Sequence, residues 1–187
     1  MKVEINGNTL ELILGDITKQ TTDAIVNAAN GTLLGGGGVD GAIHRAAGPE
    51  LLQECRRIRK EVLNGKELPT GEAVITDGFQ LPAKYVIHTV GPVWRGNLER
   101  EGELLSNCYQ NSLNLAAEKK LKSISFPSIS TGVYRFPEEL ASVIALKTII
   151  NFLKRNQLGE VKMVLFSQKD FEIYGQSLKN ILSGKEL

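Results

Sequence analysis

Short apolar runs rich in valine and isoleucine alternate with segments of helical period along almost the whole chain, which constrains the fold more than any other feature. The runs predict strands over residues 9–14, 24–28, 73–76, 85–90, 123–126 and 161–166. The periodic segments predict helices over residues 39–47, 49–63, 102–120, 137–156 and 170–182, with polar loops at 64–71 and 95–103. Several of these strands are too continuously apolar to face water on one side. The pattern predicts an α/β fold with helices on both faces of a mostly parallel or mixed sheet.

Length and charge narrow the class of protein. No internal repeat, low-complexity tract or linker interrupts the 187 residues, so we expect one domain, 1–187, that folds without a disulfide, metal or partner. The net charge of +1 gives no strong signal for nucleic acid. No apolar run approaches membrane-spanning length, and the polar residues after Met1 do not resemble a secretory signal. We therefore expect a cytoplasmic protein that does not bind a membrane.

The cysteines and histidines do not form a predicted metal site. Cys55 and Cys108 lie on helical stripes of leucine and isoleucine and belong to no CxxC motif, which predicts buried thiols. His88 lies in an apolar strand and His44 in the helix after a glycine run, so each is expected to be packed or hydrogen-bonded. Two histidines alone do not make a zinc site. The sequence therefore predicts no bound metal.

Four consecutive glycines, Gly35 to Gly38, join a predicted strand to a predicted helix. Such a run can turn successive backbone amides toward a phosphate without a Cβ in the way, and the helix N-terminus that follows also favours an anion. The alternative is a mobile surface turn. The spacing Gly36-x-Gly38-x-x-Gly41 matches the dinucleotide fingerprint, but the loop follows the second predicted strand and no acidic residue ends the next one at the expected distance. This context is against a dinucleotide site.

Two further loops follow predicted strands in the same manner. Residues 128–134, Ser-Ile-Ser-Thr-Gly-Val-Tyr, offer amides and hydroxyls that could grip the other side of a diphosphate, although an ordinary strand-to-helix turn has the same composition. Residues 15–18, Gly-Asp-Ile-Thr, follow the first predicted strand. Asp16 either caps a short helix or accepts a hydrogen bond from an exocyclic amine such as that of adenine.

In this order, the motifs resemble those of a macrodomain of the MacroD type. The similarity rests on residues 15–18, on Asn-Ala-Ala-Asn at 27–30, on Gly-Gly-Gly-Gly-Val-Asp-Gly-Ala-Ile-His at 35–44, on His-Thr-Val-Gly-Pro at 88–92 and on Ser-Thr-Gly-Val-Tyr at 130–134. It spans essentially the whole chain. The resemblance implies a three-layer α/β/α sandwich with a mixed central sheet, which binds ADP-ribose at one sheet edge and often hydrolyses ADP-ribosyl esters.

The resemblance also implies roles for the matching residues. Asn30 and Asp40 would face the distal ribose, with Asp40 positioning water or acting as general base and Asn30 fixing a ribose hydroxyl. The implied substrate-binding residues are Asp16, Ile17 and Phe171 for adenine, Gly37, Gly38, Val39, Ser130, Thr131, Gly132 and Val133 for the diphosphate, Tyr134 for the distal ribose, and Asn27.

Two residues depart from the family's usual Gly-Val-Tyr-Gly-Tyr-Pro, namely Arg135 and Phe136. Arg135 puts a long cation where the family tends to have glycine. It either helps to neutralise the diphosphate, steers acidic protein substrates, or is a solvated surface residue.

Hydrolysis of an ADP-ribosyl ester needs only water, so we predict a hydrolase with no covalent nucleophile, no metal and no other cofactor. The expected partners are ADP-ribose and its esters, including O-acetyl-ADP-ribose, and proteins mono-ADP-ribosylated on Asp or Glu. A phosphate oxygen of the substrate could orient the water in place of Asp40. The alternative function is a non-catalytic module that reads ADP-ribose on proteins or senses free nucleotide, and the pairing of Asn30 with Asp40 favours the enzyme.

Overall fold

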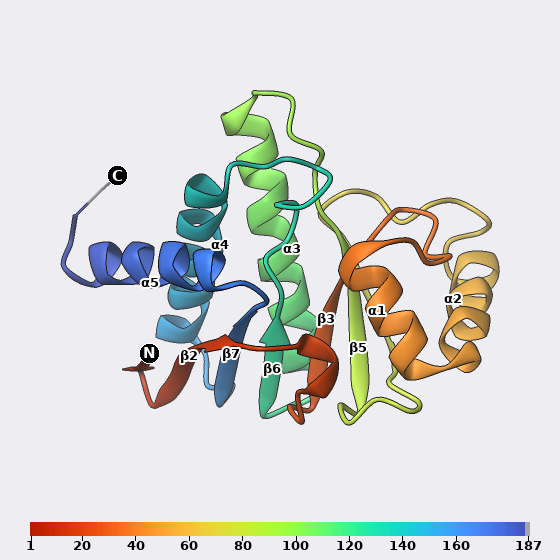
Figure 1. The fold of residues 1–187 in the computed structure, drawn as a ribbon. Helices are drawn as coiled ribbons and strands as arrows, with labels where there is room; N and C mark the ends of the chain where they lie inside the picture. The colour runs from red at the N-terminus through yellow and green to blue at the C-terminus, as the bar shows by residue number, and fades with distance from the viewer. Residues whose placement is uncertain (186–187) are drawn as a thin grey trace.

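The computed structural model describes residues 1–185, and Glu186 and Leu187 lie outside the described residues. Its strands are β1 (Lys2–Ile5), β2 (Asn8–Leu14), β3 (Ala24–Ala29), β4 (Ala73–Asp77), β5 (Tyr85–Val90), β6 (Ser123–Phe126) and β7 (Glu160–Leu165). Its helices are the short 3₁₀ helix η1 (Ile17–Lys19) and α1 (Gly38–Ala47), α2 (Pro49–Glu61), α3 (Leu98–Glu118), α4 (Glu138–Arg155) and α5 (Gln168–Leu182). Figure 1 shows the strands gathered into one sheet with helices on both sides.

The seven strands form a mixed sheet in the order β1-β2-β7-β6-β3-β5-β4. The inner strands β2, β7, β6, β3 and β5 run parallel, whereas β1 and β4 pair antiparallel at the two edges. Parallel strands covered by helices are buried on both faces, which explains their continuously apolar sequences. The predicted three-layer α/β/α sandwich with a mixed central sheet is confirmed.

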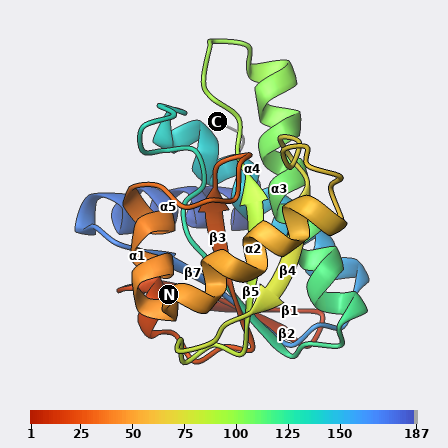
Figure 2. The same ribbon diagram turned by 90° about the vertical axis from the view of Figure 1, so that its right-hand side faces the viewer.

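Side chains alternate across the sheet and build an apolar core on each face. On β3, Ile25 and Ala29 belong to the cluster that contains α1 and α2, while Ala24 and Val26 belong to the cluster that contains α3, α4 and α5. In Figure 1 these two groups of helices lie on opposite sides of the strands, and Figure 2 shows α1 and α2 in front of β3 and β5. The face of each strand residue therefore decides which helices it contacts.

The sequence prediction missed β1, which pairs with β2 through a hairpin. The hairpin turns at Asn6 and Gly7, with φ of 53° and 80°. Two consecutive positive φ angles are what a type I′ turn needs, and Asn-Gly is a sequence that strongly favours it. The turn residues of this hairpin therefore predict it, although β1 is too short for its apolar pattern to predict a strand.

The predicted loop over residues 95–103 was wrong from Leu98 onward, because α3 begins there. Asn97 Oδ1 accepts a hydrogen bond from the backbone N–H of Arg100 at 3.1 Å and so caps the first turn. α5 likewise begins earlier than predicted, behind the capping hydroxyl of Ser167. Capping side chains thus lengthen both helices beyond the range that their apolar periodicity indicates.

Both cysteines are buried free thiols, as predicted. Burial raises the pKa of Cys55 to about 12 and that of Cys108 to about 11, so neither is a thiolate at neutral pH. Cys55 packs in the cluster with α1 and α2, and Cys108 in the cluster with α3 to α5. Within residues 1–185, no helix has the length and apolar character needed to cross a membrane.

Candidate functional site

The carboxyl ends of the five parallel strands all lie along one edge of the sheet, and the loops that follow these strand ends contain the motifs. β3 continues through residues 30–37 into α1 on one face, whereas its neighbour β6 continues through residues 127–137 into α4 on the other face. Figure 1 shows both loops above the same edge. In open α/β sheets, ligands bind where neighbouring strands send their connections to opposite faces. The fold therefore brings both loops to such a switch point.

The glycine loop, Gly35 to Gly38, has the geometry of an anion site. No side chain among residues 1–185 caps α1, so its first backbone N–H groups have no side-chain acceptor there. Gly36, Gly37 and Gly38 are exposed, and a Cβ built on either of the last two would meet no atom within 4 Å. Gly38 has a φ of 57°, which glycine adopts without strain. Free amides, the positive end of a helix and open space together suit a phosphate.

Asn30, directly after β3, and Asp40, in the first turn of α1, converge beside Gly36. A Cβ built on Gly36 would lie 3.2 Å from Asn30 Nδ2 and 3.2 Å from Asp40 Oδ2. Glycine at this position therefore leaves the space between an amide nitrogen and a carboxylate oxygen open. The Asp40 residue is only 5% exposed. The structure thus brings together the two residues that the sequence predicts as the reactive pair.

Asp40 Oδ1 is held by side chains from the sheet and from its own helix. It accepts a hydrogen bond from Asn27 Nδ2 at 2.8 Å and lies 3.4 Å from His44 Nε2. Asn27 Nδ2 also lies 3.1 Å from Nδ1 of His88 on β5. Burial, and after it the proximity of His44, lowers the pKa of His88 from 6.5 to about 4, so this ring is neutral at physiological pH. Asn27, predicted to bind substrate, is fully buried and contacts Asp40.

Asn30 shapes the loop that it precedes. Its Nδ2 donates to the carbonyl oxygen of Gly35 at 2.9 Å. Its Oδ1 accepts from the backbone N–H of Thr32 at 3.0 Å and from the Thr32 hydroxyl. An asparagine side chain that bonds to backbone two residues ahead forms an Asx turn. Because an amide nitrogen has two hydrogens, Asn30 can hold this turn and still donate to a ligand.

The 128–134 loop combines a buried hydroxyl with an exposed tip. Ser130 has a φ of 67°, and its Oγ is buried without a hydrogen-bond partner among residues 1–185. Val133 at the tip is 91% exposed. The Tyr134 carbonyl accepts from the N–H of Trp94 at 2.8 Å, which ties the loop to the segment that follows β5. The loop that contains the predicted diphosphate residues therefore begins at the same end of the parallel strands as the glycine loop.

The two departures from the family pattern have different structural consequences. Phe136 is 1% exposed and packs against Trp94, with ring centroids 4.7 Å apart. Arg135 is exposed and has a φ of 61°, the left-handed conformation that favours glycine. Phe136 therefore serves the core, whereas Arg135 carries backbone strain of about 1 kcal/mol.

Asp16 and Ile17 begin η1 at the end of β2. Asp16 Oδ1 accepts from the backbone N–H of Thr18 at 2.9 Å and from its hydroxyl at 2.7 Å. The predicted helix-capping role of Asp16 is confirmed. Ile17 is buried in the cluster with α1 and α2. The role of Asp16 toward adenine stays a prediction.

Two aromatic side chains follow β7. Phe171, predicted to stack on adenine, is half-buried and packs against the core on the α3 to α5 face. Phe166 follows β7 directly and is 85% exposed. The N–H of Gly15 donates to the carbonyl of Leu165 at 2.9 Å, so Phe166 leaves the sheet beside the segment that contains Asp16. The sequence analysis did not single out Phe166 as a candidate, because an apolar residue at the end of a covered strand resembles a core residue until the strand end is known.

Comparison with known proteins decides the family, because a sequence model of the Macro domain matches residues 26–145. The chain belongs to the Macro domain family. It is 51% identical over 170 residues to the O-acetyl-ADP-ribose deacetylase of Escherichia fergusonii, covering 90% of this chain and 94% of that protein. It is 52% identical over 177 residues to the ADP-ribose glycohydrolase MACROD2 of Homo sapiens, covering 93% of this chain and 40% of that protein. A solved Oceanobacillus iheyensis macrodomain with ADP is 61% identical, with a TM-score of 0.96, covering 98% of this chain and 97% of that one.

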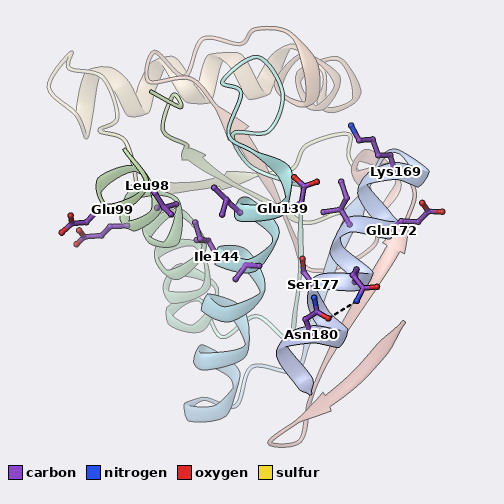
Figure 3. A pocket seen from close by; sticks show the side chains of 14 residues that line it. Leu98, Glu99, Glu139, Ile144, Lys169, Glu172, Ser177 and Asn180 are labelled. Carbon is purple, nitrogen blue, oxygen red and sulfur yellow. Dashed lines mark hydrogen bonds between the residues drawn. The ribbon is translucent and has the colours of Figure 1, made fainter. Parts of the chain in front are cut away.

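This Macro domain chain also has a hollow of about 980 Å³ on the outer face of α3, α4 and α5. Figure 3 shows its lining, with Leu98 from α3, Ile144 from α4 and Lys169 from α5. None of the predicted site residues lines it. The hollow is therefore separate from the glycine loop and the reactive pair. Within residues 1–185, no three His, Cys, Asp or Glu side chains lie close enough together to hold a metal ion.

Proposed function

We propose that this protein binds ADP-ribose and hydrolyses ADP-ribosyl esters, both O-acetyl-ADP-ribose and mono-ADP-ribosylated Asp or Glu on proteins. The observation that carries this proposal is the convergence of Asn30 and Asp40 beside Gly36, next to a glycine loop with uncapped amides. The names of the relatives, a deacetylase and a glycohydrolase, support hydrolysis. The relative solved with ADP supports recognition of the adenine and diphosphate.

In this proposal the parts of the substrate that do not react supply the binding energy. The amides of Gly37, Gly38 and Val39 and those of the 130–133 segment hold the diphosphate, and Asp16 with the Ile17 amide reads the adenine. Binding energy from such remote groups can be used to orient the reacting end of a substrate. The distal ribose then lies against Asn30 and Asp40.

Hydrolysis places the hydroxyl of water on the carbon that is attacked and one proton on the departing oxygen, so the products are ADP-ribose and a carboxylic acid. In our proposal, Asn30 donates to a ribose hydroxyl while Asp40 Oδ2, the oxygen beside Gly36, orients the water and accepts its proton. A positioned base of this kind contributes about 10² to 10⁴ in rate. A phosphate oxygen of the substrate is the alternative acceptor for that proton.

A second candidate is a module that binds ADP-ribose without cleaving it. One observation favours it: Asn30 already bonds to Gly35 and Thr32, and Asp40 to Asn27, so both side chains also serve to hold the binding loop. A reader would need this loop geometry without any chemistry. The two candidates therefore differ in turnover and not in affinity.

The test is to incubate the protein with a mono-ADP-ribosylated acidic protein and, separately, with O-acetyl-ADP-ribose, and to measure the release of ADP-ribose or acetate. We expect both substrates to be cleaved. Asp40→Ala should lower turnover by about 10²-fold or more and leave ADP-ribose affinity, measured by calorimetry, within roughly tenfold. If the parent binds ADP-ribose but cleaves neither substrate, it is a reader. If affinity and turnover fall in parallel in Asp40→Ala, Asp40 serves recognition instead of chemistry.

A further inference from the structure

Behind Asp40, a row of buried polar side chains crosses β3, β5 and β4 on the face covered by α1 and α2. Asn27 on β3 and His88 on β5 are paired in the parallel register, and both are fully buried. Asn27 Nδ2 lies 2.8 Å from Asp40 Oδ1 and 3.1 Å from His88 Nδ1. Thr76 on β4 continues the row, with its Oγ1 3.0 Å from His88 Nε2 and 3.0 Å from the carbonyl oxygen of Asp77. Within residues 1–185, the side-chain hydrogen bonds of Asn27, His88 and Thr76 go to Asp40, to one another and to Asp77, and none goes to the glycine loop.

The hydrogens of this row can be assigned one by one. Asn27 Nδ2 has two hydrogens and no lone pair to offer, so it donates both to Asp40 and to His88. His88 Nδ1 must then be the bare nitrogen, and Nε2 carries the hydrogen of the neutral ring. That hydrogen points to Thr76 Oγ1, whose own hydrogen goes to the Asp77 carbonyl. Every contact in the row is satisfied by this single arrangement.

Either alternative placement of the hydrogens would bring two acceptors or two donors against each other. If the Asn27 amide were turned over, its oxygen would face the Asp40 carboxylate. If His88 carried its hydrogen on Nδ1, that hydrogen would face the hydrogens of Asn27 Nδ2. Asn27 Oδ1 is itself buried without a hydrogen-bond partner among residues 1–185, so only the two contacts of its nitrogen hold the amide in place. The bare Nδ1 of His88 is one of these two contacts.

We propose that His88 is a positioning residue for the reaction: its unprotonated Nδ1 holds the Asn27 amide in the orientation that donates to Asp40, and thereby fixes the carboxylate beside Gly36 and Asn30. This inference rests on the proposed function. His88 touches neither the ligand loops nor the reacting atoms, so it acts through Asn27. Its low pKa agrees with the proton assignment, because a doubly protonated ring would have no acceptor for Asn27. The titratable groups that face the ring are Asp40 and His44.

The test uses two amide substitutions of His88 that keep different halves of the ring. Asparagine places its amide oxygen near the position of Nδ1 and so keeps the acceptor for Asn27, whereas glutamine reaches only the position of Nε2 and keeps the contact to Thr76. We expect His88→Asn to retain kcat within about threefold, and His88→Gln to lose on the order of tenfold or more in kcat, with ADP-ribose affinity within about threefold in both.

A purely structural role predicts the opposite order, because asparagine is the smaller side chain and leaves the larger cavity in the core. A kcat for His88→Gln equal to or above that of His88→Asn would therefore overturn the inference. The ¹⁵N spectrum of His88 in the parent protein needs no variant to fold, and we expect Nε2 protonated and Nδ1 bare. The reverse tautomer would also overturn the inference. An inactive parent would instead count against the proposed function, and the role of His88 in the reaction would fail with it.

Discussion

Gly36 is the residue at which the candidate reactive side chains meet. The carboxylate of Asp40 and the amide of Asn30 each lie 3.2 Å from the empty Cβ position of Gly36. That distance is shorter than an ordinary van der Waals contact with a carbon atom. A methyl group at this position must therefore displace one of the two side chains by a few tenths of an ångström. Neighbouring Gly37 has no such constraint, since nothing lies within 4 Å of its Cβ position.

We therefore expect Gly36→Ala to lower kcat for ester cleavage by on the order of tenfold, because small displacements of oriented groups are costly in rate. Gly37→Ala is the matched control, since it adds the same methyl group one residue along, where it meets no protein atom. Its kcat at saturating substrate should stay within about threefold of the parent, and any loss should fall on ADP-ribose affinity, because the Gly37 amide is proposed to hold the diphosphate. Equal kcat values for the two variants would show that the gap beside Gly36 does not matter to the chemistry.

In the proposed complex with ADP-ribose, Phe166 and Phe171 are alternative candidates for stacking on the adenine. Phe166 is 85% exposed, whereas Phe171 is half-buried against the core. Stacking of a base on an aromatic ring is worth about 1 to 3 kcal/mol, so we expect Phe166→Ala to weaken ADP-ribose binding by about tenfold or more in calorimetry, with little change in melting temperature. Phe171→Ala should chiefly lower the melting temperature. If Phe171→Ala weakens binding more than Phe166→Ala does, the original sequence prediction is correct.

At the residue scale, the motifs predict which side chains gather at the sheet edge, but not what each one touches. Asn30 and Asp40 were predicted as a pair, and the structure brings them together. Asn27 was predicted on the substrate and lies instead beneath Asp40. The difference arises from strand alternation: Asn27 points into the layer of α1, whereas Asn30 lies beyond the end of β3. Sequence patterns place the end of a strand only to within about two residues, so they do not show which asparagine lies inside β3 and which lies beyond it.

At the element scale, two glycines inside helices have opposite surroundings. A Cβ on Gly41 in α1 would lie 2.5 Å from the carbonyl oxygen of Gly36, so the helix packs against the glycine loop through this residue. A Cβ on Gly175 in α5 would meet nothing within 4 Å. Glycine is required at the first position for close approach of two backbones. At the second it only lowers helix propensity.

Gly175→Ala should stabilise the protein by about 0.5 to 1 kcal/mol and raise its melting temperature by about 1 to 4 °C, with ADP-ribose affinity unchanged. Gly41→Ala should destabilise it by about 1 to 3 kcal/mol and weaken ADP-ribose binding, because the loop must move away from the helix. Thermal unfolding with and without ADP-ribose measures both effects. A Gly41→Ala variant as stable as the parent, with the same ligand-induced shift, would contradict the close packing of loop and helix.

The order of elements was predictable from apolar pattern, whereas the ends and edges were not. Every α-helix of the described residues was expected, but α3 and α5 begin early because Asn97 and Ser167 cap them. β1 was missed because it has only four residues, of which Val3 and Ile5 alone pack against the core. Its turn residues, Asn6 and Gly7, contain the signal instead. Turn and capping residues therefore indicate the ends of helices and the edge hairpin, which the apolar periodicity does not indicate.

At the scale of the whole molecule, the sheet joins the candidate reactive residues to both helical layers. The cluster with α1 and α2 lies on the face that holds Asn27 and His88, and the cluster with α3 to α5 lies on the other face. Because both clusters use side chains of the same strands, we expect the described fold to unfold in one cooperative transition. A change in the charge of one fully buried group should then appear in the stability of the entire molecule.

His88 is the group for which this linkage can be measured. Its pKa is about 4 in the folded protein against an ordinary 6.5, so between these values the unfolded chain binds a proton that the folded protein does not. The contribution of the neutral His88 ring to the free energy of unfolding is therefore fully present above pH 6.5 and is lost as the pH falls toward 4. This contribution amounts to about 3 kcal/mol, at 1.36 kcal/mol for each unit of pKa.

Carboxylates also titrate in this pH range, so the parent is compared with His88→Asn, which has no titratable group at this position. Urea denaturation at a series of pH values should show a steeper loss for the parent than for this variant between pH 6.5 and 4. Parallel curves would mean that His88 is protonated in the folded sheet at its ordinary pKa, so that the Asn27 contact to Nδ1 could not persist below that pH.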